Sequence, residues 1–198
     1  AYFVETDGVT GISLNTGQNN SGTFDTGGAG SDTISDIENL LGSDFNDNLA
    51  GLFNVIDGGA GDDNLGIALF ALTPDFIGGD GVDTFDFSDP GFRTNDEHFI
   101  DLNVGYDFRG DGESLDGTLE GIENVKGSVA QDTIIGTDGD NTLDGNDNDD
   151  TISGGGGNDT ILGGAGDDEL NGGDGQDFIN GGTGADTMSG GADNDVYV

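Results

Sequence analysis

From Gly127 to Val198 the chain reads GSVAQDTII, GTDGDNTLD, GNDNDDTIS, GGGGNDTIL, GGAGDDELN, GGDGQDFIN, GGTGADTMS and GGADNDVYV. These eight blocks have nine residues each and follow one another without insertion or deletion. Their common pattern is G-G-x-G-x-D-x-U-x, where U is large and apolar. A register that holds over eight blocks indicates a repeat architecture in which neighbouring repeats stack.

Strand geometry turns this pattern into a fold. The glycines allow the first six residues of a repeat to turn tightly, several of them at positive φ, which leaves three residues for a strand. Two repeats then complete one coil, and repeats n and n+2 stack about 4.8 Å apart, so equivalent side chains of every second repeat face each other. We therefore predict an all-β fold, a parallel β-roll. Its inward-facing eighth positions are Ile134, Leu143, Ile152, Ile161, Leu170, Ile179, Met188 and Tyr197.

The sixth position carries Asp in seven of the eight repeats and Asn in the other, and stacking gathers these side chains into two ladders. The first ladder is Asp132, Asp150, Asp168 and Asp186; the second is Asn141, Asp159, Asp177 and Asp195, with Glu123 one repeat before Asn141. Ca²⁺ lies roughly 2.3–2.6 Å from each of its oxygen ligands, so two ligands on opposite sides of one ion are about 5 Å apart, close to the spacing of stacked strands. Adjacent acids therefore predict up to seven calcium sites, weaker at Asn141, with carbonyl oxygens of the turn glycines completing the coordination.

Without metal the ladders are repulsive. Two carboxylates about 5 Å apart repel by on the order of 3 kcal/mol at an effective dielectric constant near 20. One large apolar side chain in nine residues gives little burial to oppose this repulsion and the entropy of ordering the chain. We expect the roll to be largely disordered without calcium, so that the free energy of calcium binding becomes free energy of folding.

Composition supports a cation-binding protein. The 198 residues include 41 acidic and 3 basic side chains, for a formal net charge of -38. This charge excludes nucleic acids and anionic membrane surfaces as partners of the bare chain and favours divalent cations. There is no cysteine and no apolar run of about 18 residues, so we expect no thiolate site and no membrane span. The start at Ala1 lacks the features of a signal peptide, and we interpret the chain as a segment of a longer protein.

The first two thirds of the chain contain a second, less regular unit. The segment 36–43, DIENLLGS, is echoed by GIENVKGS at 121–128, which indicates a duplication. Nonapeptide-like blocks begin at residues 27, 42, 58 and 78, and a seven-residue turn, two residues short, spans 51–57. The predicted ligand positions are Asp32, Glu38, Asp47, Asp63 and Asp83, and Asp47 is expected to face Asp63 across the short turn.

Three segments follow from this pattern. Residues 1–77 form a first irregular roll unit with an apolar insertion at 67–77, which we interpret as a cap over the roll or, alternatively, a contact surface for a neighbouring domain. Residues 78–126 hold a connecting nonapeptide and a wider β segment, where Ile100, Leu102 and Val104 alternate with polar residues as in a half-buried strand. Residues 127–198 form the regular roll. The density of glycine argues against helix beyond a turn or two.

These motifs resemble the RTX family of secreted bacterial proteins. The order DTFDFS, IDLN, GIENVKGS and then nonapeptides is similar to the calcium-binding C-terminal region of serralysin-type metalloproteases and of large RTX adhesins. The resemblance implies type I secretion and folding in extracellular calcium. It implies calcium ligation by Glu38 and Glu123, and by the carbonyls of glycines at positions one, two and four. In the regular repeats these are Gly154, Gly155, Gly157, Gly163, Gly164, Gly166, Gly172, Gly173, Gly175, Gly181, Gly182 and Gly184.

We expect no enzyme active site in this segment. A zinc protease centre needs H-E-x-x-H, and the single histidine is His98, which we predict to be a surface residue beside a strand. Three functions remain open: a structural or folding module of an adhesin, toxin or surface-layer protein; the noncatalytic C-terminal region of a secreted protease, lipase or polysaccharide-modifying enzyme; or a roll that binds a cell surface or polysaccharide. The expected partners are calcium ions, about seven in 121–198 and a few in the first unit, and the flanking domains of the parent protein.

Overall fold

A computed structural model describes residues 13–15, 22–25, 31–34, 39–51, 53–67, 74–88, 97–110 and 113–198. These residues form strands and turns, and none of them is helical, as the glycine density predicts. In this part of the chain there is accordingly no helix of the length and apolarity that crossing a membrane requires. The chain divides into two compact units, unit 1 with Ala1–Asp86 and Gly117–Ile122, and unit 2 with Phe87–Asp116 and Glu123–Val198.

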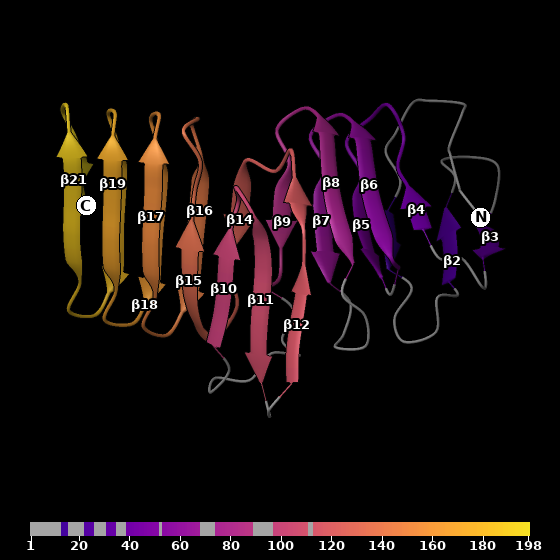
Figure 1. The fold of residues 1–198 in the computed structure, drawn as a ribbon, viewed down its shortest axis with the longest axis horizontal. Helices are drawn as coiled ribbons and strands as arrows, with labels where there is room; N and C mark the ends of the chain where they lie inside the picture. Colours follow the sequence, from indigo (N-terminus) through magenta and orange to yellow (C-terminus); the bar gives the residue numbers. More distant parts are fainter. Residues whose placement is uncertain are drawn as a thin grey trace. The chain divides into compact units, whose positions relative to one another are not determined.

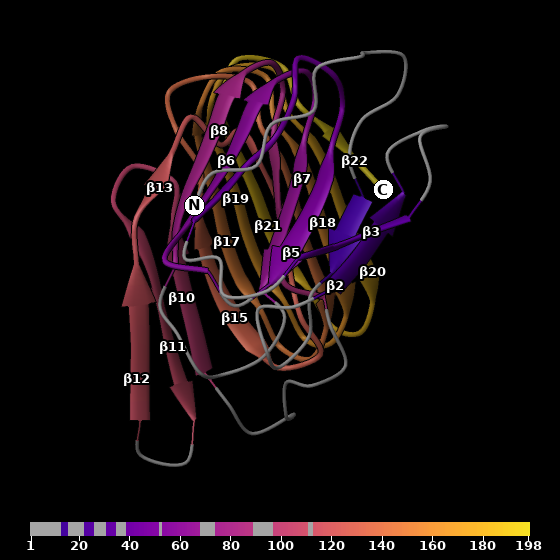
Figure 2. The same cartoon turned by 90° about the vertical axis from the view of Figure 1, so that its right-hand side faces the viewer.

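Unit 2 contains two layers; from β14 (Asn124–Lys126) onward the chain alternates between them and the strands within each layer are parallel. One layer has the order β14, β16 (Thr142–Asp147), β18 (Thr160–Ala165), β20 (Phe178–Thr183) and β22 (Val196–Tyr197). The other has the order β12 (Glu113–Gly117), β11 (Gly105–Gly110), β10 (Glu97–Asp101), β15 (Gln131–Ile135), β17 (Thr151–Gly156), β19 (Glu169–Asp174) and β21 (Thr187–Ala192). Figure 1 shows β17, β19 and β21 side by side, and in Figure 2 they follow one another in depth, with β18 and β20 across the coil.

The register within these layers is the predicted one. Ile161 of β18 pairs with Ile179 of β20, and Ile152 of β17 pairs with Leu170 of β19. In both cases the partners occupy the same position in repeats n and n+2. The prediction of a parallel β-solenoid with two repeats per coil is confirmed.

The strands are longer than predicted. β18 runs from the seventh position of one repeat to the third position of the next, and Gly164 still pairs with Gly182. Gly164 has a φ of 110°, so the glycine conformation required for the turn is accommodated within the paired segment. The expectation of three-residue strands was wrong because stacking of identical backbone shapes keeps the ladder intact beyond the apolar position.

The apolar column forms the core of unit 2. Ile134, Leu143, Ile152, Ile161, Leu170 and Ile179 are at most 1% exposed. The two last members differ from the prediction: Met188 is half-buried, and Tyr197 is 50% exposed. Tyr197 lies on β22, which pairs with β20 on one side and with no other described strand, so its side chain is only half covered, while its hydroxyl accepts a 2.6 Å hydrogen bond from the N–H of Gly190.

The segment that precedes the regular repeats forms a hairpin in unit 2. β10 pairs in parallel with β15 and antiparallel with β11, as Figure 1 shows for β10 to β12. Ile100 and Leu102 are buried as expected, whereas Val104 is 70% exposed. The alternation fails at Val104 because the strand ends at Asp101 and the chain turns there.

Unit 1 also has two parallel layers and one antiparallel pair. One layer has the order β1 (Ser13–Asn15), β5 (Asn48–Gly51), β7 (Asn64–Ile67) and β9 (Thr84–Asp86); the other has β13 (Leu119–Glu120), β8 (Asp75–Asp80), β6 (Val55–Ala60) and β4 (Asn39–Leu41). β2 (Gly22–Asp25) and β3 (Ser31–Ile34) pair with each other. The core contains Leu40, Leu49, Phe53, Ile56, Leu65, Phe76 and Phe85, all at most 1% exposed.

Part of the predicted apolar insertion belongs to this core. Residues 75–77 lie in β8, where Phe76 pairs with Ile56 and its ring centroid lies 4.9 Å from that of Phe85. These residues are therefore a strand of the roll rather than a cap, while 68–73 lie outside the described residues. The sequence suggested one connecting segment, 78–126. In the structure residues 78–86 belong to unit 1 and residues 87–116 to unit 2.

Candidate metal sites

Each sixth-position side chain is joined to its neighbour in the ladder by a hydrogen bond. The backbone N–H of Asp150 donates to Oδ1 of Asp168 over 2.8 Å. The same bond runs from Asp132 to Asp150 (2.8 Å), Asp168 to Asp186 (3.1 Å), Asn141 to Asp159 (2.8 Å), Asp159 to Asp177 (2.8 Å) and Asp177 to Asp195 (3.1 Å). In every acid after the first position of its ladder, one carboxylate oxygen is thus used to hold the stack in register.

Unit 1 contains a shorter ladder of the same kind. The N–H of Asp47 donates to Oδ1 of Asp63 over 2.7 Å, and the N–H of Asp63 donates to Oδ1 of Asp83 over 2.8 Å. The separations along the chain are 16 and 20 residues, whereas the ladder bonds of unit 2 join residues 18 apart. Asp47 therefore faces Asp63 across the short turn, as the spacing predicts.

In five of these acids the second carboxylate oxygen is buried and has no hydrogen-bond partner among the residues that the structure describes. They are Asp63, Asp150, Asp159, Asp168 and Asp177, each at most 3% exposed, and the atom is Oδ2 in every case. A buried carboxylate oxygen without a donor is costly, and such groups in proteins are otherwise paired or bound to a metal. At these five oxygens a bound cation would satisfy the buried carboxylate.

Backbone carbonyls surround these oxygens. A Cβ built on Gly154 would collide with Asp159 Oδ2 and would lie 2.6 Å from the carbonyl oxygen of Gly172, the equivalent glycine two repeats later. A Cβ on Gly173 would collide with the carbonyl oxygen of Gly155, and one on Gly175 with that of Gly157. The gap between two stacked turns thus holds a carboxylate oxygen and carbonyls from positions one, two and four.

Burial raises the pKa of several ladder acids. The pKa of Asp150 is raised to about 8, chiefly because burial disfavours the charged form. Burial, with a smaller contribution from neighbouring ladder carboxylates, likewise raises the pKa of Asp159 and of Asp63 to about 6. The pKa of Asp168 is raised for the same reasons. A bound cation would reverse this effect, because it stabilises the charged carboxylate.

The donor set fits calcium. In the part of the chain that the structure describes, no three His, Cys, Asp or Glu side chains come together as a metal cluster. Side chains alone therefore cannot hold an ion in these gaps, and carbonyl oxygens must supply most ligands. Ca²⁺ accepts six to eight oxygens, carbonyls among them, in flexible geometry, whereas Mg²⁺ requires a near-ideal octahedron and retains its waters.

The remaining predicted ligands occupy varied positions. Asp186 and Asp195 are half-buried at the last turns, and Glu123 is half-buried with its carbonyl accepting a 2.7 Å hydrogen bond from Asn141 Nδ2. Asp32 lies in β3, which pairs antiparallel with β2, so its backbone is not part of a parallel ladder. Glu38 lies outside the described residues. Calcium ligation by Asp32 and by Glu38 stays a prediction.

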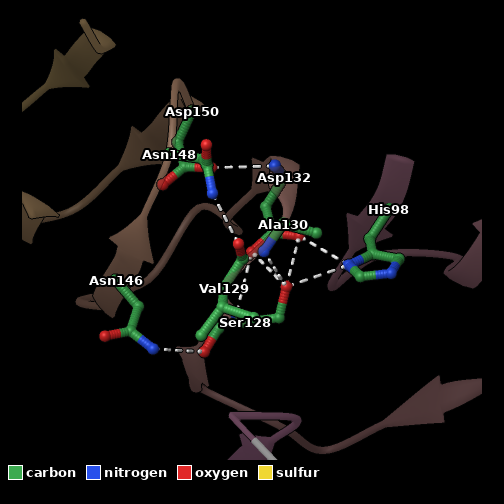
Figure 3. Close-up of polar contacts among 9 residues, drawn as sticks. His98, Ser128, Val129, Ala130, Asp132, Asn146, Asn148 and Asp150 are labelled. Carbon is green, nitrogen blue, oxygen red and sulfur yellow. Dashed lines mark hydrogen bonds and ion pairs between the residues drawn. The ribbon is translucent and has the colours of Figure 1, made fainter. Parts of the chain in front are cut away.

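The prediction of a surface position for His98 was wrong. His98 is 3% exposed, because β10 pairs with β15 and places it opposite Asp132. Its Nδ1 lies 2.7 Å from Asp132 Oδ1 and 3.1 Å from Ser128 Oγ, as Figure 3 shows. A catalytic triad needs the serine on the imidazole nitrogen opposite the aspartate, whereas here both contact Nδ1. The trio is therefore not arranged as a serine nucleophile with its base.

Three serine or threonine side chains in the turns were also missed. Ser43, Ser128 and Thr137 stand at the second position of a repeat, where the pattern has glycine. Each donates its backbone N–H to the sixth-position side chain of its own repeat, at 2.6, 2.8 and 2.7 Å respectively. The departure from glycine at this position was the available signal.

A separate ladder of exposed fifth-position side chains, distinct from the two sixth-position ladders, was missed as well. Oδ1 of Asp149 accepts from the N–H of Asp167, and Oδ1 of Asp167 accepts from the N–H of Ala185, both over 2.8 Å. In this ladder the side chain bonds to the next turn, whereas in the sixth-position ladder it bonds to the preceding one. Each turn is therefore held from both sides.

Comparison with known proteins agrees with this geometry. Residues 127–161 and 162–197 match the family model described as RTX calcium-binding nonapeptide repeat (4 copies). No curated protein matches the chain. The matched residues are those that form the two stacked ladders of unit 2. The C-terminal block of this chain therefore contains RTX calcium-binding nonapeptide repeats.

Proposed function

We propose that the chain is a calcium-dependent folding module of a larger secreted bacterial protein. The observation that carries the proposal is the set of buried Oδ2 atoms that have no hydrogen-bond partner within the described part of the chain, at Asp63, Asp150, Asp159, Asp168 and Asp177. In the regular repeats, each gap between two stacked glycine turns places such an oxygen close to backbone carbonyl oxygens. This is an all-oxygen environment suited to Ca²⁺.

Calcium binding and folding are coupled in this proposal. In the absence of a cation the folded ladder must keep like charges close together or take up protons, as the raised pKa of Asp150 indicates. A gap exists only when the turns of repeats n and n+2 have stacked, so the unfolded chain contains no preformed site. The free energy of binding therefore stabilises the folded state alone.

The extracellular setting follows from the family and from calcium availability. RTX repeats are typical of secreted bacterial proteins, and extracellular calcium modules bind with dissociation constants of roughly 10⁻⁴–10⁻³ M. A chain with a formal net charge of -38 would remain extended at low calcium and would fold where calcium is abundant. In this proposal the module contributes structure and folding to its parent protein, and any catalytic centre would belong to another part of that protein.

The test is a calcium titration of the 198-residue chain followed by far-UV circular dichroism, with magnesium as the control. We expect a cooperative gain of β structure at submillimolar to millimolar calcium and no transition with magnesium. Native mass spectrometry of the same samples should show several calcium ions bound per folded chain. Full β structure in excess chelator, or folding that magnesium supports equally well, would refute the proposal.

A further inference from the structure

We infer that the first turn of each ladder in unit 2, residues 127–132 and 136–141, binds no calcium and is closed by hydrogen bonds instead. Calcium binding then starts at the second turn of each ladder. This inference rests on the proposed calcium-binding function and specifies which turns perform it.

Turns with serine or threonine at the second position have a different local structure. The hydroxyl of Ser128 accepts a 2.9 Å hydrogen bond from the N–H of Ala130, and that of Thr137 accepts one of 3.1 Å from the N–H of Gly139. The calcium-type turn that starts at Gly154 instead has positive φ at its second and fourth positions. Neither of the two Ser/Thr turns has a positive φ at these positions.

Asp132 has both carboxylate oxygens engaged by protein donors. Oδ2 accepts from the N–H of Ser128 over 2.8 Å, and the Ser128 hydroxyl lies 3.3 Å from each oxygen. Oδ1 faces His98 Nδ1 at 2.7 Å (Figure 3). His98 thus takes the place that a backbone N–H has at the other rungs. A cation at Asp132 would have to displace these donors, whereas the Oδ2 atom of Asp150 has none to displace.

The carbonyls of this first turn are also occupied. Asn148 Nδ2 donates to the carbonyl oxygen of Val129 over 2.6 Å, and Asn146 Nδ2 donates to that of Gly127 over 3.4 Å (Figure 3). Both asparagines belong to the next turn of the same ladder, and both have positive φ. Amide donors therefore lie in the gap in which carbonyls would face an ion.

The first turn of the second ladder is closed in the same way. Oδ1 of Asn141 accepts from the N–H and the hydroxyl of Thr137 at 2.7 and 3.1 Å, and its Nδ2 donates to the carbonyl of Glu123. Asn103 Nδ2 donates to the carbonyl oxygen of Gly136 over 2.8 Å. An amide nitrogen at this position repels a cation. We therefore infer that Asn141 takes part in no calcium site, whereas the sequence predicted a weak one.

This assignment changes the ion count. Adjacent acids predicted up to seven sites in residues 121–198, whereas buried Oδ2 atoms without partners occur in this stretch at four acids, Asp150, Asp159, Asp168 and Asp177. The closed turns instead provide a face whose hydrogen bonds need no metal, on which the calcium-binding turns stack. Ser43 and Asp47 make the same contacts in unit 1, with the N–H of Ser43 2.6 Å from Asp47 Oδ2.

The direct test is a crystal structure of the calcium-loaded chain with an anomalous difference map for calcium. We expect a peak between turns 145–150 and 163–168 and none between turns 127–132 and 145–150. A peak in the latter gap would overturn the inference. Absence of calcium from every gap would refute the proposed function itself, so the two failures can be told apart.

A matched pair of variants tests the inference in solution. Native mass spectrometry should find the same number of calcium ions on D132N as on the wild type, and at least one ion fewer on D168N. The carboxamide of D132N can accept the Ser128 N–H bond as Asn141 accepts that of Thr137, so we expect the variant to fold. Loss of an ion from folded D132N would contradict the inference, and the wild-type map decides the matter if D132N does not fold.

Discussion

Replacing Gly172 with alanine should remove one calcium site without straining the backbone. Gly172 is not among the residues with positive φ, so alanine can adopt its conformation. The added Cβ, however, would collide with Asp177 Oδ2 and would lie 2.6 Å from the carbonyl oxygen of Gly190. These two oxygens are on opposite sides of the gap proposed to hold an ion, so the methyl group would occupy the place of their shared ligand.

The size of the effect follows from linkage. At a free calcium concentration a hundred times the dissociation constant, one bound ion stabilises the folded state by about 2.7 kcal/mol. Four acids of unit 2 have the buried unpartnered oxygen, so the variant would have to fold on three ions. In the variant three ions must supply the folding free energy that four supply in the wild type. If the ions bind in one cooperative transition and the wild-type folding midpoint lies at about a hundred times the dissociation constant, the calcium concentration at the midpoint should therefore rise about fivefold.

The assay is a calcium titration followed by circular dichroism, with Gly156→Ala as the matched control. Gly156 also lies in the regular repeats and lacks positive φ, but its added Cβ would meet no atom closer than the Asp138 Cα at 3.5 Å, an ordinary contact. We expect the Gly156→Ala midpoint to stay within about twofold of the wild type, consistent with a neutral or slightly stabilising glycine replacement. Equal midpoints and equal ion counts for the two variants would refute the assignment of the gap as a calcium site.

Three further predictions concern pH, the core and the turn conformation. In excess chelator, β structure should decrease as pH rises from 5 to 8, because burial raises the folded-state pKa of Asp150 to about 8 and of Asp159 to about 6, above the ordinary value for Asp. The contribution of these protonated acids to folding is therefore present at low pH and is lost as pH rises past these pKa values. A circular dichroism signal that does not change with pH would contradict this. In saturating calcium, Leu170→Ala should cost about 2–5 kcal/mol in thermal or denaturant unfolding, since Leu170 is 1% exposed, whereas Val196→Ala, at a side chain 54% exposed, should cost less than about 0.5 kcal/mol; similar losses would argue against the inward column. Asn148 has a φ of 75°, so Asn148→Ala should destabilise by about 1–2 kcal/mol and Asn148→Gly by less; the opposite order in calorimetry would show that this conformation carries no strain.

The regular repeats could be predicted almost completely from the sequence, because one nine-residue period sets both the apolar column and the ladder acids. The period places Ile161 over Ile179 and Asp159 over Asp177, and the structure pairs them so. The length of the strands could not be obtained in the same way. It depends on pairing of glycine with glycine across the stack, and a period does not state whether such backbones remain hydrogen-bonded.

The irregular parts were less predictable for physical reasons that particular residues show. His98 carries no periodic signal, and its burial depends on the pairing of β10 with β15, a strand that comes much later in the chain. Phe76 stands in a stretch too apolar for the repeat pattern, and only the pairing with Ile56 identifies it as a rung. Tyr197 fits the apolar column but lies on the last strand, so the pattern cannot tell that it is exposed.

The two closed serine turns suggest which parts of this architecture require fixed spacing. Ser43 and Asp47 of the first unit recur as Ser128 and Asp132 in the second with the same hydrogen bonds, 2.6 and 2.8 Å from the backbone N–H to Oδ2. The later acids of the first unit do not keep the regular spacing, since they follow at 16 and 20 residues. A closed turn depends on contacts two and four residues apart within one repeat, so an insertion there would separate donor from acceptor. A ladder bond depends only on which strands stack, so the loops between rungs can change length while each acid still meets its neighbour.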